Sequence, residues 1–188
     1  MKKLSFAFSA VVLCLLLSCN DKTDNTASTN EKTASTNESG PSEKAKKNLE
    51  NTKAVIGLFD KGDFSNVGDY IAADAVDHAS PMGGEIKGLD SIKAMFVRMT
   101  STMSNVKNEI VRGTSDDEYS MVWVRQTWTQ TKDDAMMGMK AGQQGDIQTI
   151  DLCKHGADGK ITDHWGFMSM ADMMKMMPQM PKDTTGNK

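Results

Sequence analysis

The hydrophobic pattern of the chain changes its period near residue 105, and this change limits the folds open to it. Upstream, apolar residues recur at helical steps, most clearly at Leu89, Ile92, Met95, Phe96, Met99 and Met103. Downstream, residues 106–168 hold segments rich in Tyr, Val, Trp and Thr, which favour strands. Helices followed by antiparallel strands predict an α+β domain whose helices pack on one face of a sheet.

The elements can be placed from caps, turns and periodicity. We expect a helix from Ser42 to Gly62, a short helix from Asp63 to Ile71, an extended piece over 75–78 and a long helix over 89–103. Strands are expected at 106–112, 119–131, 144–155 and 160–168, and a last helix at 171–177 before Pro178. A sheet of this kind can curve around its helices and enclose a cavity.

The N-terminus has the features of a bacterial lipoprotein signal. Lys2 and Lys3 precede an apolar run that is too short to be a good membrane span, and Leu16-Leu17-Ser18-Cys19 resembles a lipobox. We expect residues 1–18 to be a signal peptide and Cys19 to carry acyl chains such as palmitate, which anchor the chain to a membrane. Asn20 and Asp21 favour the outer membrane of a bacterial cell envelope. An ordinary secretory signal that contains a cysteine is the alternative.

Residues 19–44 are expected to form a disordered tether. TASTNEK and TASTNES repeat in tandem, and no large apolar residue occurs from Asn20 to Asn48. A coiled coil would need apolar residues at two positions of each heptad, and these are missing. One domain, residues 45–177, follows the tether, and residues 178–188 are expected to be a flexible tail.

Charge and cysteine content argue against several classes of protein. The chain has 22 Lys and Arg against 25 Asp and Glu, and it has no basic patch, so we expect no nucleic-acid partner. Cys14 leaves with the signal and Cys19 is lipidated, so Cys153 has no partner for a disulfide. Zinc-type spacings of Cys and His are missing as well. No metal ligands are assigned on this basis, and no cofactor is expected.

Three segments carry a resemblance to a known family. AADAVDHASP (72–81), GLDSIKAMF (88–96) and IDLCKHGADGKITDHW (150–165) are similar to motifs of the SnoaL-like polyketide cyclases in the nuclear transport factor 2-like superfamily. The resemblance covers residues 45–177. It implies a cone-shaped barrel, made of a curved antiparallel sheet with the N-terminal helices packed on its concave face. It also implies a homodimer formed through the open face of the sheet.

Asp151 is the first candidate for a catalytic residue. Strand alternation places it on the same face as Thr149 and Cys153. In an apolar cavity a carboxyl group loses hydration, which favours its protonated form and suits proton transfer. The resemblance implies that Asp151 is a general acid/base and that His78, Asp163 and His164 lie at the pocket mouth. A purely structural aspartate, paired with a nearby donor, is the alternative for Asp151, and a hydrogen-bonding or capping role is the alternative for His78.

Four aromatic residues are candidates for the ligand pocket: Tyr119, Trp123, Trp128 and Trp165. Alternation puts Trp123 and Trp128 on opposite faces of one strand, so one packs in the core and the other lines a pocket or a subunit interface. His164 and Trp165 likewise point to opposite faces. Packing in the core is the alternative for each tryptophan.

Methionine is frequent, with 16 residues in the chain. Many of them fall in two clusters: Met136, Met137 and Met139; then Met168, Met170, Met173, Met174, Met176, Met177 and Met180. Thioethers are soft ligands for Cu(I), so a copper-handling envelope protein is one interpretation. Methionine also fills irregular gaps and lines apolar pockets. The helical spacing of Met170, Met173, Met174 and Met177 favours packing.

These observations leave three hypotheses for the function. The first is a membrane-anchored domain that binds a small, largely apolar molecule in a conical pocket. The second is an enzyme of the isomerase, cyclase or dehydratase type on the same pocket, with Asp151 as general acid/base. The third is copper handling by the methionine clusters.

Overall fold

A computed structural model describes residues 40–79, 83–135 and 138–176 of the chain. The chain divides into two units, Met1–Asn37 and Glu38–Lys188, and every described residue belongs to the second. The expected signal peptide, the lipidated Cys19, most of the tether and the tail at 178–188 lie outside the described residues. Within the described part, no helix combines the length and the apolar character needed to cross a membrane.

Helix α1 (Glu43–Lys61) begins and ends where its sequence predicts. Ser42 caps its start by accepting a hydrogen bond from the Ala45 amide at 3.0 Å. Gly62 ends it in the left-handed conformation, at φ 63°, which glycine adopts without a steric penalty. The helix contacts strands β3 and β4 and buries Val55, Ile56 and Leu58. These contacts cover one face of the sheet.

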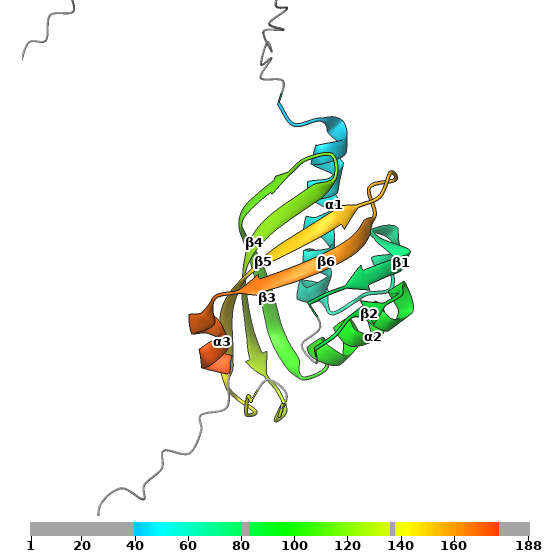
Figure 1. Ribbon diagram of the computed structural model, residues 1–188. Helices are drawn as coiled ribbons and strands as arrows, with labels where there is room; N and C mark the ends of the chain where they lie inside the picture. Colours follow the sequence, from blue (N-terminus) through cyan, green and yellow to red (C-terminus); the bar gives the residue numbers. More distant parts are fainter. Residues whose placement is uncertain (1–39, 80–82, 136–137, 177–188) are drawn as a thin grey trace, which may run out of the picture. The chain divides into compact units, whose positions relative to one another are not determined.

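The sheet has six strands in the order β2-β1-β6-β5-β4-β3. Their bounds are β1 (Ile71–Asp77), β2 (Ile86–Lys87), β3 (Met103–Ser115), β4 (Tyr119–Gln130), β5 (Gln144–His155) and β6 (Ile161–Met168). Strands β3 to β6 form the expected antiparallel meander. The α+β class is confirmed, and Figure 1 shows the sheet curving past the helices. In the described part of the chain, β2 and β3 stand at opposite edges of this sheet and do not pair with each other, so the sheet is not closed into a barrel.

The main difference from the expected fold lies at β1. The sequence predicts a short helix up to Ile71 and only a brief extended piece, whereas 71–77 is a strand paired in parallel with β6. The helical part shrinks to a 3₁₀ turn, η1 (Val67–Asp69). Ile71, Ala75 and Asp77 are buried in this strand. The pattern is hard to see locally because the partner strand lies far along the sequence.

Helix α2 (Leu89–Thr100) is also shorter than predicted, since Met103 begins β3. The side chain of Thr100 bonds to the Phe96 carbonyl at 2.9 Å, and that of Ser101 bonds to the Arg98 carbonyl at 2.7 Å. Hydroxyl groups that bond to the carbonyls of the last turn satisfy acceptors that a longer helix would use. Helix α3 (Met170–Met176) follows β6.

The core joins the helices to the sheet. The rings of Phe59 and Phe96 pack edge-to-face with their centroids 4.8 Å apart, and Phe64 packs against both rings. Ile92, Cys153 and Ile161 belong to the same buried cluster. The cluster thereby packs α1 and α2 on the inner face of the sheet. It leaves a hollow between the helices and the sheet.

Candidate functional site

A cavity of about 320 Å³ lies between the helices and the inner face of the sheet. Side chains from α1, α2 and five strands line it, and most of them are apolar. Examples are Val55, Phe59, Ile92, Phe96, Val124 and Ile147. Its size falls at the lower end of the range for small-molecule sites.

One wall of the cavity carries three charged side chains in a row. His164 Nδ1 lies 3.1 Å from Asp77 Oδ1, and His164 Nε2 lies 3.4 Å from Asp151 Oδ1. All three residues line the cavity. Asp77 comes from the end of β1, His164 from β6 and Asp151 from β5. We call this set the Asp-His-Asp array.

Strand pairing explains how these three side chains meet. His164 pairs with Cys153 across the β5–β6 ladder and with Asp77 across the parallel β1–β6 ladder. The β5–β6 register shifts at Thr162, so that both Ile161 and His164 point inward. Without this bulge, period-two alternation would place His164 on the outer face.

Electrostatics in the array favour a charged imidazole. Burial lowers the pKa of His164, but the hydrogen bonds and negative charges of Asp151 and Asp77 outweigh it and raise that pKa to about 9. Burial raises the pKa of Asp77, but the His164 ring and the Ala79 amide lower it by more. The pKa of Asp77 is therefore below its ordinary value. At neutral pH His164 is therefore an imidazolium that donates from both ring nitrogens to carboxylates.

Two small residues complete this wall. Cys153 lines the cavity beside His164, and burial raises the pKa of its thiol to about 12, so it is no nucleophile at neutral pH. Gly166 pairs with Asp151, and a Cβ atom placed there would lie 3.1 Å from Ala79 Cβ and 4.0 Å from Asp151 Oδ1. A side chain at Gly166 would therefore crowd Ala79, and the glycine itself puts no side chain beside the carboxylate.

A second polar group on the cavity wall consists of two amides. Gln126 Nε2 donates to Asn108 Oδ1 at 3.0 Å, and Asn108 Nδ2 donates to Asp60 Oδ1 at 2.7 Å. Both amide side chains line the cavity. These contacts fix the Asn108 amide, so it is a defined polar point on a mainly apolar surface.

The third histidine of the chain is buried and structural. His155 Nδ1 faces the Gly159 carbonyl at 3.0 Å, so this nitrogen carries the proton and Nε2 accepts from Ser120 at 2.8 Å. Ser120 in turn contacts Thr52 of α1 at 2.7 Å. Burial lowers the pKa of His155, so its ring is neutral. The network ties α1 to β4 and β5.

His78, for which a catalytic role was expected, is not among the described residues that line the cavity. Its Nδ1 lies 3.0 Å from Glu85 and its Nε2 lies 3.3 Å from Asp163. Its ring stacks on Trp165, with ring centroids 4.7 Å apart. Neighbouring residues of a strand point to opposite faces, so Asp77 enters the cavity and His78 cannot. The hydrogen-bonding alternative describes His78 correctly.

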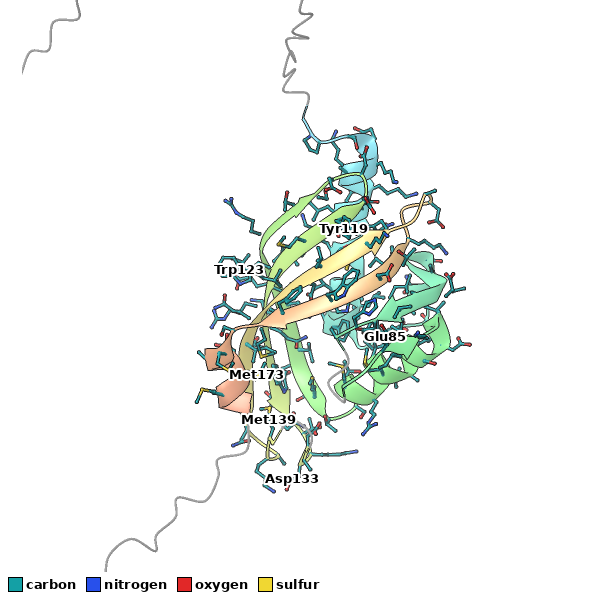
Figure 2. All side chains as sticks on the ribbon, viewed as in Figure 1. Glu85, Tyr119, Trp123, Asp133, Met139 and Met173 are labelled. Carbon is teal, nitrogen blue, oxygen red and sulfur yellow. The ribbon has the colours of Figure 1, made fainter. Side chains whose placement is uncertain are left out.

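The four aromatic residues expected in the pocket are not among its lining residues. Tyr119 and Trp123 occupy the outward positions of β4, and Figure 2 shows Trp123 on the side of the sheet away from α2. Trp165 stacks on His78 in the outward position of β6. Trp128 points inward but is 1% exposed and covers Gly145, where a Cβ atom would lie 2.2 Å from its ring. It fills the core instead of lining the hollow.

The methionines divide between the cavity and the surface. Met95, Met99, Met103 and Met168 line the cavity. Met170, Met173 and Met174 on α3 are 69%, 46% and 59% exposed, so the packing expected for this stripe is wrong for these three. Met173 is labelled on α3 in Figure 2, apart from Met139 in the loop before β5. Met136, Met137, Met177 and Met180 lie outside the described residues.

Asp77 is the residue of the candidate site that sequence reasoning missed. The sequence holds two Asp-His pairs, Asp77-His78 and Asp163-His164, and this repetition is the available signal. Only the parallel β1–β6 pairing shows that Asp77 faces His164. Among the described residues, no three His, Cys, Asp or Glu side chains form a group suited to hold a metal ion.

Comparison with known proteins agrees with this architecture. Solved structures with similar folds include a protein from Jannaschia sp. CCS1 described as a SnoaL-like polyketide cyclase (TM-score 0.59, 17% identity, 76% of this chain and 99% of that chain covered). TsrD from Streptomyces laurentii (0.58, 13%, 68% and 91%) and an LEH-like epoxide hydrolase from M. tuberculosis (0.56, 14%, 70% and 89%) are also similar. At these identities the likeness concerns the fold.

The sequence itself was compared with curated proteins and with family models. No curated protein matches the chain. The model of the SnoaL-like polyketide cyclase family matches residues 51–180, which include the whole Asp-His-Asp array. The chain therefore belongs to the SnoaL-like polyketide cyclase family, on a nuclear transport factor 2-like fold.

Proposed function

We propose that this protein is a lipid-anchored domain of the bacterial cell envelope that binds a small, largely apolar molecule in its cavity. The observation that carries the proposal is the cavity of about 320 Å³, whose apolar wall ends at the Asp-His-Asp array. Apolar pockets with a few fixed polar groups are the usual form of small-molecule sites. The lipobox-like segment ending at Cys19 supports the anchor.

Native mass spectrometry of the chain purified gently from its own host tests this proposal. We expect an extra organic mass that disappears on denaturation. Thr149→Trp fills the cavity, since Thr149 lines it, and should abolish the extra mass. Thr127→Trp on β4 is the matched control, because Thr127 is not among the cavity-lining residues. An extra mass that survives in Thr149→Trp would contradict the proposed place of binding.

A second candidate function is proton transfer on a bound carbonyl compound, and the Asp-His-Asp array favours it. Asp151 would remove a proton from carbon as general base, while His164 holds its Oδ1 in place. Incorporation of deuterium into cyclohexanone in D₂O, followed by NMR, tests this activity. Exchange should be faster than with buffer alone and should be lost in Asp151→Asn. Equal exchange in that variant removes Asp151 from the chemistry.

Exposed apolar side chains on the outer face of the sheet support the proposal that the protein is a homodimer. Met121, Trp123, Ile150 and Phe167 are between 38% and 54% exposed, and we call them the outer-face patch. Trp123, Ile150 and Phe167 lie in one row across three neighbouring strands. Large contiguous apolar surfaces of this kind mark sites of association.

Copper handling remains a separate candidate at another place in the domain. The exposed thioethers of Met170, Met173 and Met174 favour it, because their spacing puts them within reach of each other on α3. Competition for Cu(I) with bicinchoninate tests it. Substitution of all three residues by Leu should lower Cu(I) affinity, and unchanged affinity excludes this site.

A further inference from the structure

The charge on the cavity wall is not balanced. Among the described residues that line the cavity, Asp77, Asp151 and His164 are the charged ones, and these described residues include no lysine or arginine. Two carboxylates and one imidazolium give a formal charge of −1. The wall around this charge is apolar, and an unbalanced charge in such surroundings is costly because hydration is lost.

The negative charge is accessible at Asp151. Oδ1 of Asp151 faces His164, and within the described part of the chain no hydrogen bond to Oδ2 is made. The Asp151 side chain is 21% exposed, whereas that of Asp77 is 4% exposed. Gly166 pairs with Asp151 and places no side chain in front of it. A ligand can therefore reach a carboxylate oxygen that is already held in place.

The cation that the described part of the wall provides, His164, is already paired. Both ring nitrogens of His164 face carboxylates, Asp77 on one side and Asp151 on the other. An anionic ligand would have to displace one of these partners while it approached two negative charges. A cationic ligand would meet a free acceptor and bring the wall to neutrality.

We infer that the cavity takes an amphipathic organic amine, with its ammonium group on Asp151 and its apolar part against Phe59, Phe96 and Ile147. This inference rests on the proposed binding function and names its ligand class. The ammonium donates to Oδ2 of Asp151 while His164 keeps Oδ1. Met95, Met99 and Met168 line the same cavity. Their flexible side chains accommodate apolar groups of varied shape.

Three probes of equal chain length separate charge from apolar burial: octylamine, octanol and octanoate. Their dissociation constants for the chain are measured by isothermal titration calorimetry at neutral pH. Octylamine should bind at least about tenfold more tightly than octanol, because it adds a charged hydrogen bond to the same apolar contact. Octanoate should bind more weakly than octanol.

A matched pair of variants assigns the effect to one carboxylate. Asp151→Asn keeps the shape of the side chain and should reduce the affinity for octylamine about tenfold, to that of octanol. Asp74→Asn removes the same charge from an exposed position of β1 outside the cavity and should change nothing. An equal loss in both variants would show only a general effect of net charge and would overturn the assignment.

The outcomes separate this inference from the proposed function. Octylamine and octanol binding equally well, or octanoate binding best, overturns the amine inference and leaves the apolar cavity as a binding site. If none of the three probes binds, the amine inference fails. Native mass spectrometry then tests separately whether the cavity holds another kind of molecule.

Discussion

Asp77 and His164 stand opposite each other on two parallel strands, with 3.1 Å between Asp77 Oδ1 and His164 Nδ1. The next residues repeat this pairing on the other face of the sheet, where Asp163 faces His78 at 3.3 Å. Two Asp-His dipeptides, offset by one residue across the parallel strands, thus give one pair inside the cavity and one outside. The inner pair gains a second carboxylate from Asp151, and this addition creates the candidate site.

The first prediction concerns the charge of His164. Asp77→Asn and Asp151→Asn should each lower the pKa of His164 from about 9, because each removes one stabilising negative charge. A fall of about one unit or more is expected for a carboxylate at hydrogen-bond distance. NMR titration of the imidazole resonances measures it, with Asp74→Asn as the control. A pKa that stays unchanged in both cavity variants would show that the array is not formed.

The second prediction is the pH dependence of stability. The pKa of His164 is raised to about 9 in the folded state, whereas an unfolded histidine titrates near about 6.5. This stabilisation is therefore complete below about pH 6.5 and is lost as the pH rises through about 9. Since its side chain is 29% exposed, we expect a loss of about 1–3 kcal/mol in the free energy of unfolding.

Urea unfolding measured from about pH 6.5 to about pH 9.5 tests the second prediction. His164→Gln should flatten the curve in this range and be less stable at its lower end. His155 acts in the opposite sense, because its lowered pKa destabilises the fold only as the pH falls below about 6.5. A wild-type stability that rises between these limits would contradict the assigned charge of His164.

The third prediction compares two glycines. Gly145→Ala would place a Cβ atom 2.2 Å from the buried Trp128 ring, and should destabilise the fold by about 1–3 kcal/mol or more. Gly57 lies within α1 with nothing within 4 Å of its Cβ position, so Gly57→Ala should stabilise it by about 0.5–1 kcal/mol. Urea midpoints measure both, and opposite signs are the expected result. If Gly145→Ala is tolerated, Trp128 does not lie over that residue.

The fourth prediction concerns the outer-face patch. Wild-type protein should sediment as a dimer, and Trp123→Lys or Ile150→Lys should yield monomers, because each puts a charge into an apolar interface and neither residue lines the cavity. Ala157→Lys, in the exposed turn before β6, is the control and should remain dimeric. Analytical ultracentrifugation gives the mass directly. A wild-type monomer would leave the patch without a second copy as its partner.

The sequence predicted much of the fold but only part of the site. Local signals were sufficient for α1, where Ser42 and Gly62 mark the ends, and for β4 and β5, which pair without a register shift. Asp151 and His164 were predicted because strand alternation and the family motifs single them out. Asp77 was missed because its role depends on a parallel pairing between residues far apart in the chain. The register shift at Thr162, which turns His164 inward, is likewise absent from any local pattern.

The most direct test of the central claim is to map by NMR where an apolar probe binds. Octanol is added to methyl-labelled protein, and isoleucine signals are followed by NMR. The account predicts shifts at Ile92, Ile147 and Ile161, which line the cavity, together with the His164 ring. Ile110 and Ile150, which are 36% and 38% exposed, should stay unchanged. Shifts confined to Ile110 and Ile150, or no shifts at the cavity residues, would contradict a ligand site inside the domain.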